Sequence, residues 1–134
     1  MSSRRIKRKS TNKQSFNKAI KEIKKVWLEA VVEFKQSGKA LIESSEVLSE
    51  MELPESVKVR YEAKYNKAII TYNTLVTEVN EVVVVSSDLT VLQNMDSLIF
   101  EMHQVNMERI SIFEEFTTEI TDAMTVSKES VNAN

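Results

Sequence analysis

The side chains best placed to bind a partner are the cationic ones gathered at the N-terminus. Residues 1–25 hold ten Lys or Arg against a single acid, Glu22, which gives this segment a net charge of +9. Such a block can neutralise phosphates without reading base sequence, or can dock on an acidic protein surface. The candidate binding residues for nucleic acid or an acidic partner are Arg4, Arg5, Lys7, Arg8, Lys9 and Lys13.

A surplus of acid follows the basic segment. The whole chain has a net charge of −2, so the residues after 25 together carry −11. Residues 86–134 alone contain nine acids against Arg109 and Lys128. The four that we take as a candidate acidic pole are Glu114, Glu115, Glu119 and Asp122. This asymmetry predicts how the protein associates with others, and says little about its fold.

Residue types that support catalysis do not occur in a useful pattern. His103 is the only histidine, and Glu101 lies too close to it for a Glu-x-x-His di-iron motif. Cysteine is absent and there is one glycine, which excludes thiolate metal sites and phosphate-binding glycine loops. Glu114 and Glu115 are neighbours in sequence and therefore point to different parts of a helix surface. We predict a protein that is not an enzyme, with no metal site, no cofactor and no small-molecule substrate.

The elements that position these charges are predicted to be helices. One Gly and one Pro among 134 residues is far below the usual frequencies of about 7% and 5%. A first apolar stripe, spaced by threes and fours, contains Phe16, Ile20, Ile23, Trp27, Ala30, Phe34, Leu41, Leu48 and Met51. Thr11 and Gln14 form a possible capping box, so we expect this helix to begin near Thr11. We interpret Gly38 as a weak spot within the helix, with a bend or a close contact as the alternative.

Pro54 separates this helix from a second one, because proline suits the first turn of a helix. The second stripe contains Tyr61, Tyr65, Ala68, Tyr72, Leu75, Val79 and Val82. Four valines at 82–85 weaken a helix, and the following Ser87 and Asp88 are good N-terminal capping residues. These residues predict a break at Val85–Asp88. The alternative is one uninterrupted helix from Pro54 to about residue 127.

The third segment has the widest apolar surface. Its main stripe contains Leu92, Met95, Ile99, Met102, Phe113, Phe116, Ile120 and Ala123. A second row beside it contains Val91, Leu98, Val105 and Ile112. Asn106 and Arg109 interrupt the main stripe; they either set the register of packing or lie at its edge. A stripe of this width can face two neighbouring helices at once.

The fold class that follows is all-α, an antiparallel up-down-up bundle of three long helices. Residues 1–10 are expected to form a basic N-terminal arm, residues 11–127 a single bundle domain and residues 128–134 a polar tail. A long helical hairpin, 11–52 against 54–127, is the alternative. Up-down-up order would place the basic and acidic ends at opposite poles of a rod.

These features favour a structural or assembly protein whose basic head binds acidic protein, including its own copies, or nucleic acid. A component of a phage or virion fits this description. One alternative is a nucleic-acid-binding protein that does not self-assemble. Another is a small helical inhibitor or a membrane-surface binder, because Lys18, Lys21, Lys24 and Lys25 flank the apolar stripe.

The sequence contains neither a membrane span nor a secretory signal peptide, while residues 1–21, free of acid and rich in Ser, Arg and Lys, leave a mitochondrial presequence as an alternative. No apolar stretch approaches the roughly 20 residues of a membrane span, and lysine interrupts every early window where a signal peptide would have its apolar run. The lack of cysteine also suits a reducing compartment. We expect a cytoplasmic protein, which a virus particle could incorporate.

Overall fold

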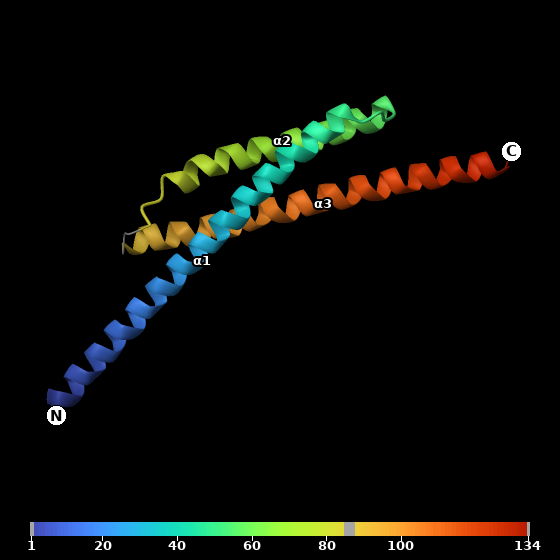
Figure 1. Cartoon of the computed structure of the whole chain (residues 1–134). Helices are drawn as coiled ribbons and strands as arrows, with labels where there is room; N and C mark the ends of the chain where they lie inside the picture. Colours follow the sequence, from blue (N-terminus) through green and yellow to red (C-terminus); the bar gives the residue numbers. More distant parts are fainter. Residues whose placement is uncertain (1, 85–87, 134) are drawn as a thin grey trace.

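The computed structural model describes the backbone of residues 2–84 and 88–133, and the side chains of residues 14–84 and 88–122. It contains three helices, α1 (Ser2–Glu50), α2 (Glu55–Asn80) and α3 (Leu89–Ala133). Each helix packs against the other two. The chain runs up α1, down α2 and up α3 (Figure 1). The predicted three-helix bundle is therefore confirmed, and the described chain does not form the alternative two-helix hairpin.

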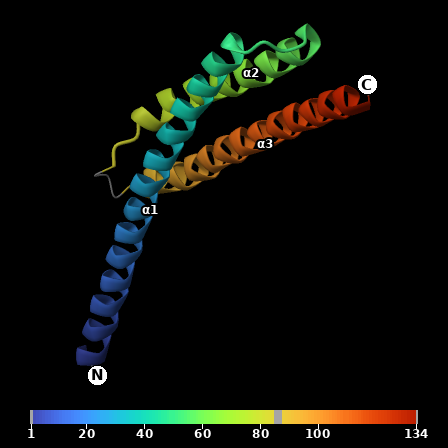
Figure 2. The same cartoon turned by 45° about the vertical axis from the view of Figure 1, so that its right-hand side comes forward.

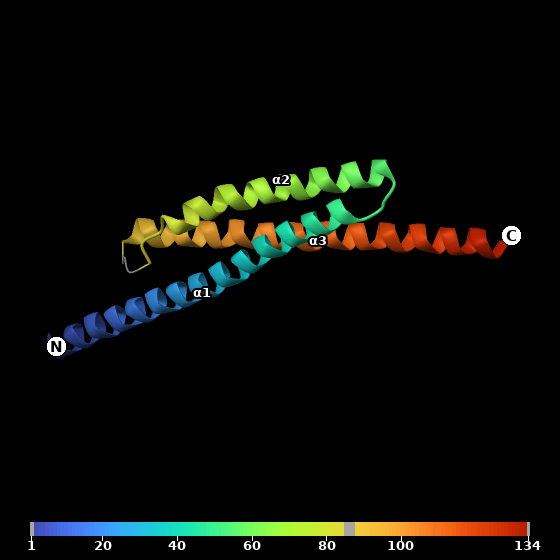
Figure 3. The same cartoon turned by 45° about the horizontal axis from the view of Figure 1, so that its top comes forward.

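The ends of α1 and α3 project from the bundle in opposite directions. The N-terminal part of α1 extends beyond α2 and α3, and the C-terminal part of α3 extends past the connection between α1 and α2 (Figures 1 and 3). α1 begins at Ser2, so the helix start expected near Thr11 is wrong. Nothing in residues 2–10 breaks a helix, because Arg and Lys have good helix propensity and Gly and Pro are absent. Likewise, α3 continues to Ala133 through the expected polar tail.

The break between the second and third helices is confirmed, although it begins earlier than expected. α2 ends at Asn80, where the N–H of Glu81 donates to the carbonyl of Glu78 at 3.3 Å, the tight geometry of a closing turn. The valines that follow are β-branched and disfavour helix, and Val82 and Val84 pack against the core instead.

α3 begins as its capping residue predicts. The Asp88 carboxylate accepts a hydrogen bond from the N–H of Thr90 at 2.7 Å, and the Asp88 carbonyl accepts one from Leu92 at 3.0 Å. This is the behaviour of a helix N-cap. Residues 85–87, which include Val85 and the proposed cap Ser87, lie outside the described residues.

One buried stripe from each helix forms the core. The side chains buried most completely are Trp27, Phe34, Leu41, Leu48, Tyr65, Met95 and Met102. All seven belong to the predicted stripes. Leu98, Val105 and Ile112 of the second row on α3 are buried too. Phe16 and Phe113 differ from expectation, because they are 53% and 54% exposed. Phe16 belongs to the N-terminal part of α1, before the first buried residue Ile20, and near Phe113 the buried residues are Ile112 and Phe116.

Gly38 of α1 lies directly against the Tyr72 side chain of α2. A Cβ atom added at Gly38 would overlap the ring of Tyr72. That ring also packs on Phe34, with 4.7 Å between the ring centroids. Gly38 is therefore a close-contact residue, which was the alternative interpretation, and the preferred interpretation of a weak spot in the helix is wrong.

Candidate functional site

The six basic residues expected to bind a partner are in the N-terminal part of α1. The side chains of Arg4, Arg5, Lys7, Arg8, Lys9 and Lys13 lie outside the described residues, so their role stays a prediction. The backbone that carries them belongs to the part of α1 that projects from the bundle (Figure 2). Further along the same helix, Lys18, Lys21 and Lys25 are exposed.

The acidic pole is partly neutralised by α2. The Glu115 carboxylate pairs with the Lys64 ammonium at 2.6 Å, and Glu119 pairs with Arg60. The Tyr61 hydroxyl donates a second hydrogen bond to Glu119, at 2.6 Å. Because these cations come from another helix, the spacing of acids along α3 could not reveal them.

Glu114 and Asp122 are the members of the acidic pole without an ion pair among the described side chains. Together with the paired groups they line one shallow cleft at the seam of α2 and α3. Its other lining residues include Arg60 and Lys64, each about 5.2 Å from the centre of the Tyr61 ring. The cleft therefore presents both signs of charge, which is less acidic than the sequence alone predicts.

Removing the charge of Glu119 tests whether these pairs stabilise the fold. We expect Glu119→Gln to lower the free energy of unfolding by no more than about 1 kcal/mol at low salt, because the pair is exposed and the amide oxygen still accepts from Tyr61. The difference should vanish in about 1 M salt, where such charges are screened. Urea titrations at both salt concentrations measure this. Glu114→Gln is the control and should leave stability unchanged, and a loss that persisted in high salt would contradict the assignment.

A buried polar cluster links α1 to α3. The Ser37 hydroxyl donates to the side-chain oxygen of Asn106, and both residues are buried. The Asn106 amide nitrogen donates to Glu33 at 3.0 Å, and Arg109 donates to Asn106 at 3.1 Å. Since a buried hydrogen-bonded pair is satisfied in one alignment of the helices, Asn106 sets register and does not lie at the edge of the seam.

Tyr65 adds a neutral hydroxyl to the interior. Burial raises the pKa of this hydroxyl, and its hydrogen bond with Ser44 acts in the opposite direction. The group therefore stays protonated at neutral pH. Tyr65 and Ser44 therefore contribute a neutral hydrogen bond to the interior of the bundle.

Neither a metal centre nor a membrane span is found in the described part of the chain. No three or more His, Cys, Asp or Glu side chains there are arranged to hold a metal ion. Within the same residues, no helix combines the length and apolar character needed to cross a membrane.

Comparison with models of protein families, with curated proteins and with solved structures gives no match for this chain. What the protein binds must therefore be inferred from its own surfaces.

Proposed function

We propose that this protein is a non-enzymatic assembly component that binds acidic protein surfaces, its own copies among them, through the basic part of α1. The observation that carries the proposal is the projection of this part of α1 beyond the other two helices (Figures 1 and 2). Seven of the ten basic residues of the +9 segment precede Ile20, which is buried in the bundle, so most of this charge belongs to the projecting part of α1. A charge held in this way is available to another molecule.

The projecting part of α1 is long enough to separate its first turns from the acids of the bundle. At 1.5 Å per residue, residues 2–13 span about 17 Å. Charges in solution are screened over roughly 8 Å at physiological ionic strength. The first turns of α1 therefore interact weakly with acids in the bundle. Incorporation into a virus particle is one setting in which repeated copies would associate through such an element.

Nucleic-acid binding without self-assembly is the second candidate, because the same basic block suits phosphate groups. Blocks of like charge at a chain terminus commonly bind nucleic acid. A membrane-surface binder is less well supported, since Ile20 and Trp27 of the basic amphipathic stretch are buried in the bundle. A small helical inhibitor stays a further alternative.

The mass in solution tests the proposal directly. Sedimentation of the full chain over a range of protein and salt concentrations should show oligomers that dissociate as salt rises, because the contacts are between opposite charges. The chain without residues 1–10 should associate more weakly. A full chain that stays monomeric under all these conditions would contradict self-assembly.

A titration with duplex and single-stranded nucleic acid separates the second candidate from the first. Phosphate binding would make log affinity fall with log salt by about 0.9 for each phosphate neutralised on a duplex, and by about 0.7 on a single strand. A monomer that binds with such a slope would replace the assembly proposal with the second candidate. An affinity that does not change with salt would exclude phosphate contacts.

A further inference from the structure

Two exposed stripes on different helices have the same spacing and opposite charge. The basic stripe on α1 follows steps of 4-3-4-3-4 and consists of Lys21, Lys25, Leu28, Val32, Lys35 and Lys39. The acidic stripe on α3 follows the same steps and consists of Asp96, Phe100, His103, Met107, Ile110 and Glu114. Steps of this kind place each set along one side of its helix.

Both stripes carry exposed apolar residues between their charged ends, and the stripe on α3 also holds His103 there. Leu28 and Val32 are 57% and 59% exposed, and Phe100 and Met107 are 64% and 54% exposed. Large apolar side chains at regular helical spacing, bordered by charge, are typical of surfaces that another helix covers. The exposed stripe of α1 is distinct from its core stripe, which runs through Trp27, one residue before Leu28 and thus about 100° around the helix. On α3, Ile110 is half-buried and the other members of the stripe are exposed.

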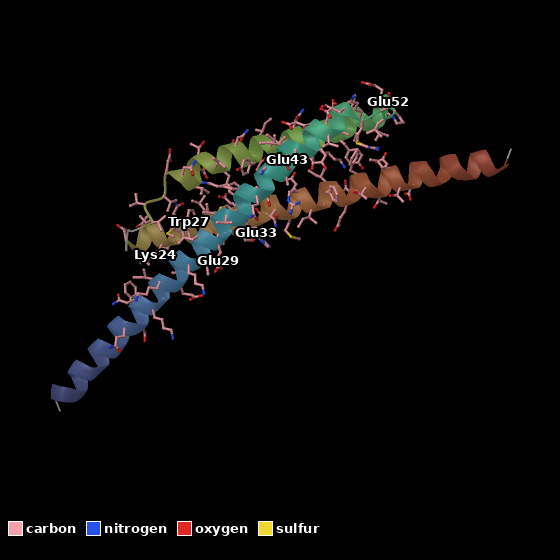
Figure 4. The ribbon with its side chains drawn as sticks, in the orientation of Figure 1. Lys24, Trp27, Glu29, Glu33, Glu43 and Glu52 are labelled. Atoms are coloured by element: carbon pink, nitrogen blue, oxygen red, sulfur yellow. The ribbon has the colours of Figure 1, made fainter. Side chains whose placement is uncertain are left out.

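The charged ends of the two stripes match in either orientation. With the helices antiparallel, Lys21 meets Glu114 and Lys39 meets Asp96, and with the helices parallel the two acids exchange partners. Lys39 forms an exposed ion pair with Glu43 at 3.9 Å, and such a pair is weak enough for a carboxylate of another molecule to replace it. Figure 4 labels Glu33, within the stretch of α1 that includes this stripe, and Glu43, one turn after its last residue.

We propose that the basic stripe of one copy packs along the acidic stripe of a second copy. This inference rests on the proposed self-assembly and extends the contact from the basic N-terminal part of α1 to the exposed stripe that continues along it to Lys39. Leu28 and Val32 would pack on the apolar centre around Phe100 and Met107, while the lysines at the ends pair with Asp96 and Glu114. The stripes are six residues each over 19 positions, a length of about 27 Å between their first and last residues.

Such a contact uses two different surfaces, so it does not close on a pair of copies by simple symmetry. Each copy keeps one free stripe of each kind, and further copies add until a ring closes or a filament extends. Assembly should therefore proceed beyond a dimer as protein concentration rises.

Charge reversal on α3 tests the contact against a matched control. The variant D96K/E114K reverses the two ends of the acidic stripe, and E101K/E108K makes the same change of charge at exposed sites on the opposite part of α3, beside α2. We expect D96K/E114K to raise the dissociation constant of self-association by at least about tenfold, because it faces lysine with lysine. The control should change it far less. Circular dichroism and thermal melting should show the same fold in both variants.

A second charge reversal, on the basic stripe of α1, completes the test. Adding K21E/K39E to D96K/E114K reverses the charge of the outermost residue at each end of both stripes, and should recover part of the lost affinity. If the wild-type chain assembles but D96K/E114K and E101K/E108K weaken it equally, the stripe contact is overturned while self-assembly stands. A wild-type chain that is monomeric throughout overturns the proposed function together with this inference.

Discussion

Replacing Trp27 with alanine should lower the free energy of unfolding by about 3–5 kcal/mol. Trp27 is 2% exposed and is the largest of the fully enclosed side chains in the core. Its removal loses the burial of the indole and leaves a cavity that the neighbouring helices cannot fill completely. Because a domain of this size is stable by only about 5–15 kcal/mol, a large part of its stability would disappear. Urea denaturation followed by far-ultraviolet circular dichroism measures this without relying on tryptophan fluorescence.

The adjacent residue provides the control for this prediction. Leu28 belongs to the same turn of α1 but is 57% exposed, so Leu28→Ala should change stability by no more than about 0.5 kcal/mol. Similar losses in the two variants would contradict the orientation of α1 in the bundle. Because Leu28 belongs to the basic stripe, the same variant also tests whether that stripe contributes to the stability of the fold. We expect that it does not.

Adding one methyl group at Gly38 should destabilise the protein, although alanine is the better helix former. In an exposed helix, Gly→Ala stabilises by about 1 kcal/mol. Here the new Cβ would overlap the Tyr72 ring, which is itself packed on Phe34. Overpacking of this kind costs about 1–3 kcal/mol, so we expect a net loss of stability for Gly38→Ala. Urea denaturation measures the size and the sign of the change in the free energy of unfolding.

The effect of Gly38→Ala on stability should change from a loss to a gain when the Tyr72 ring is absent. In a Tyr72→Ala background the overlap disappears, and Gly38→Ala should then stabilise the protein by up to about 1 kcal/mol. The two single variants and the double variant form a cycle that isolates the coupling between the two residues. If Gly38→Ala had the same effect in both backgrounds, Tyr72 would not be in contact with Gly38.

The helices and their inward faces were accessible from the sequence because periodicity is a local property. A side chain at every third or fourth position marks one side of a helix, whatever the helix packs against. The stripes through Trp27, Tyr65 and Met102 therefore coincide with the core, and the scarcity of Gly and Pro indicated the fold class. The charge asymmetry is also a property of the sequence. What that charge binds is a proposal, since its partner is not part of the chain.

The positions of the helix ends were predicted less well. Capping pairs such as Thr11 and Gln14 satisfy free N–H groups when a helix starts there, but they do not prevent a helix from starting earlier. The residues from Ser2 onward are compatible with helix, so α1 extends through them. The exposure of Phe16 follows from the same geometry, because a stripe is buried only as far as another helix accompanies it.

The sequence by itself determined three helices, the faces that they bury and the excess of positive charge at the start of α1. Only the tertiary structure decided that Arg60 and Lys64 neutralise Glu119 and Glu115, that Asn106 is buried, and that Tyr72 lies on Gly38. Each of these contacts joins residues that are distant in sequence and depends on how far one helix slides or rotates along another. That alignment minimises the free energy of the whole packed core, so local spacing along one helix carries no record of it.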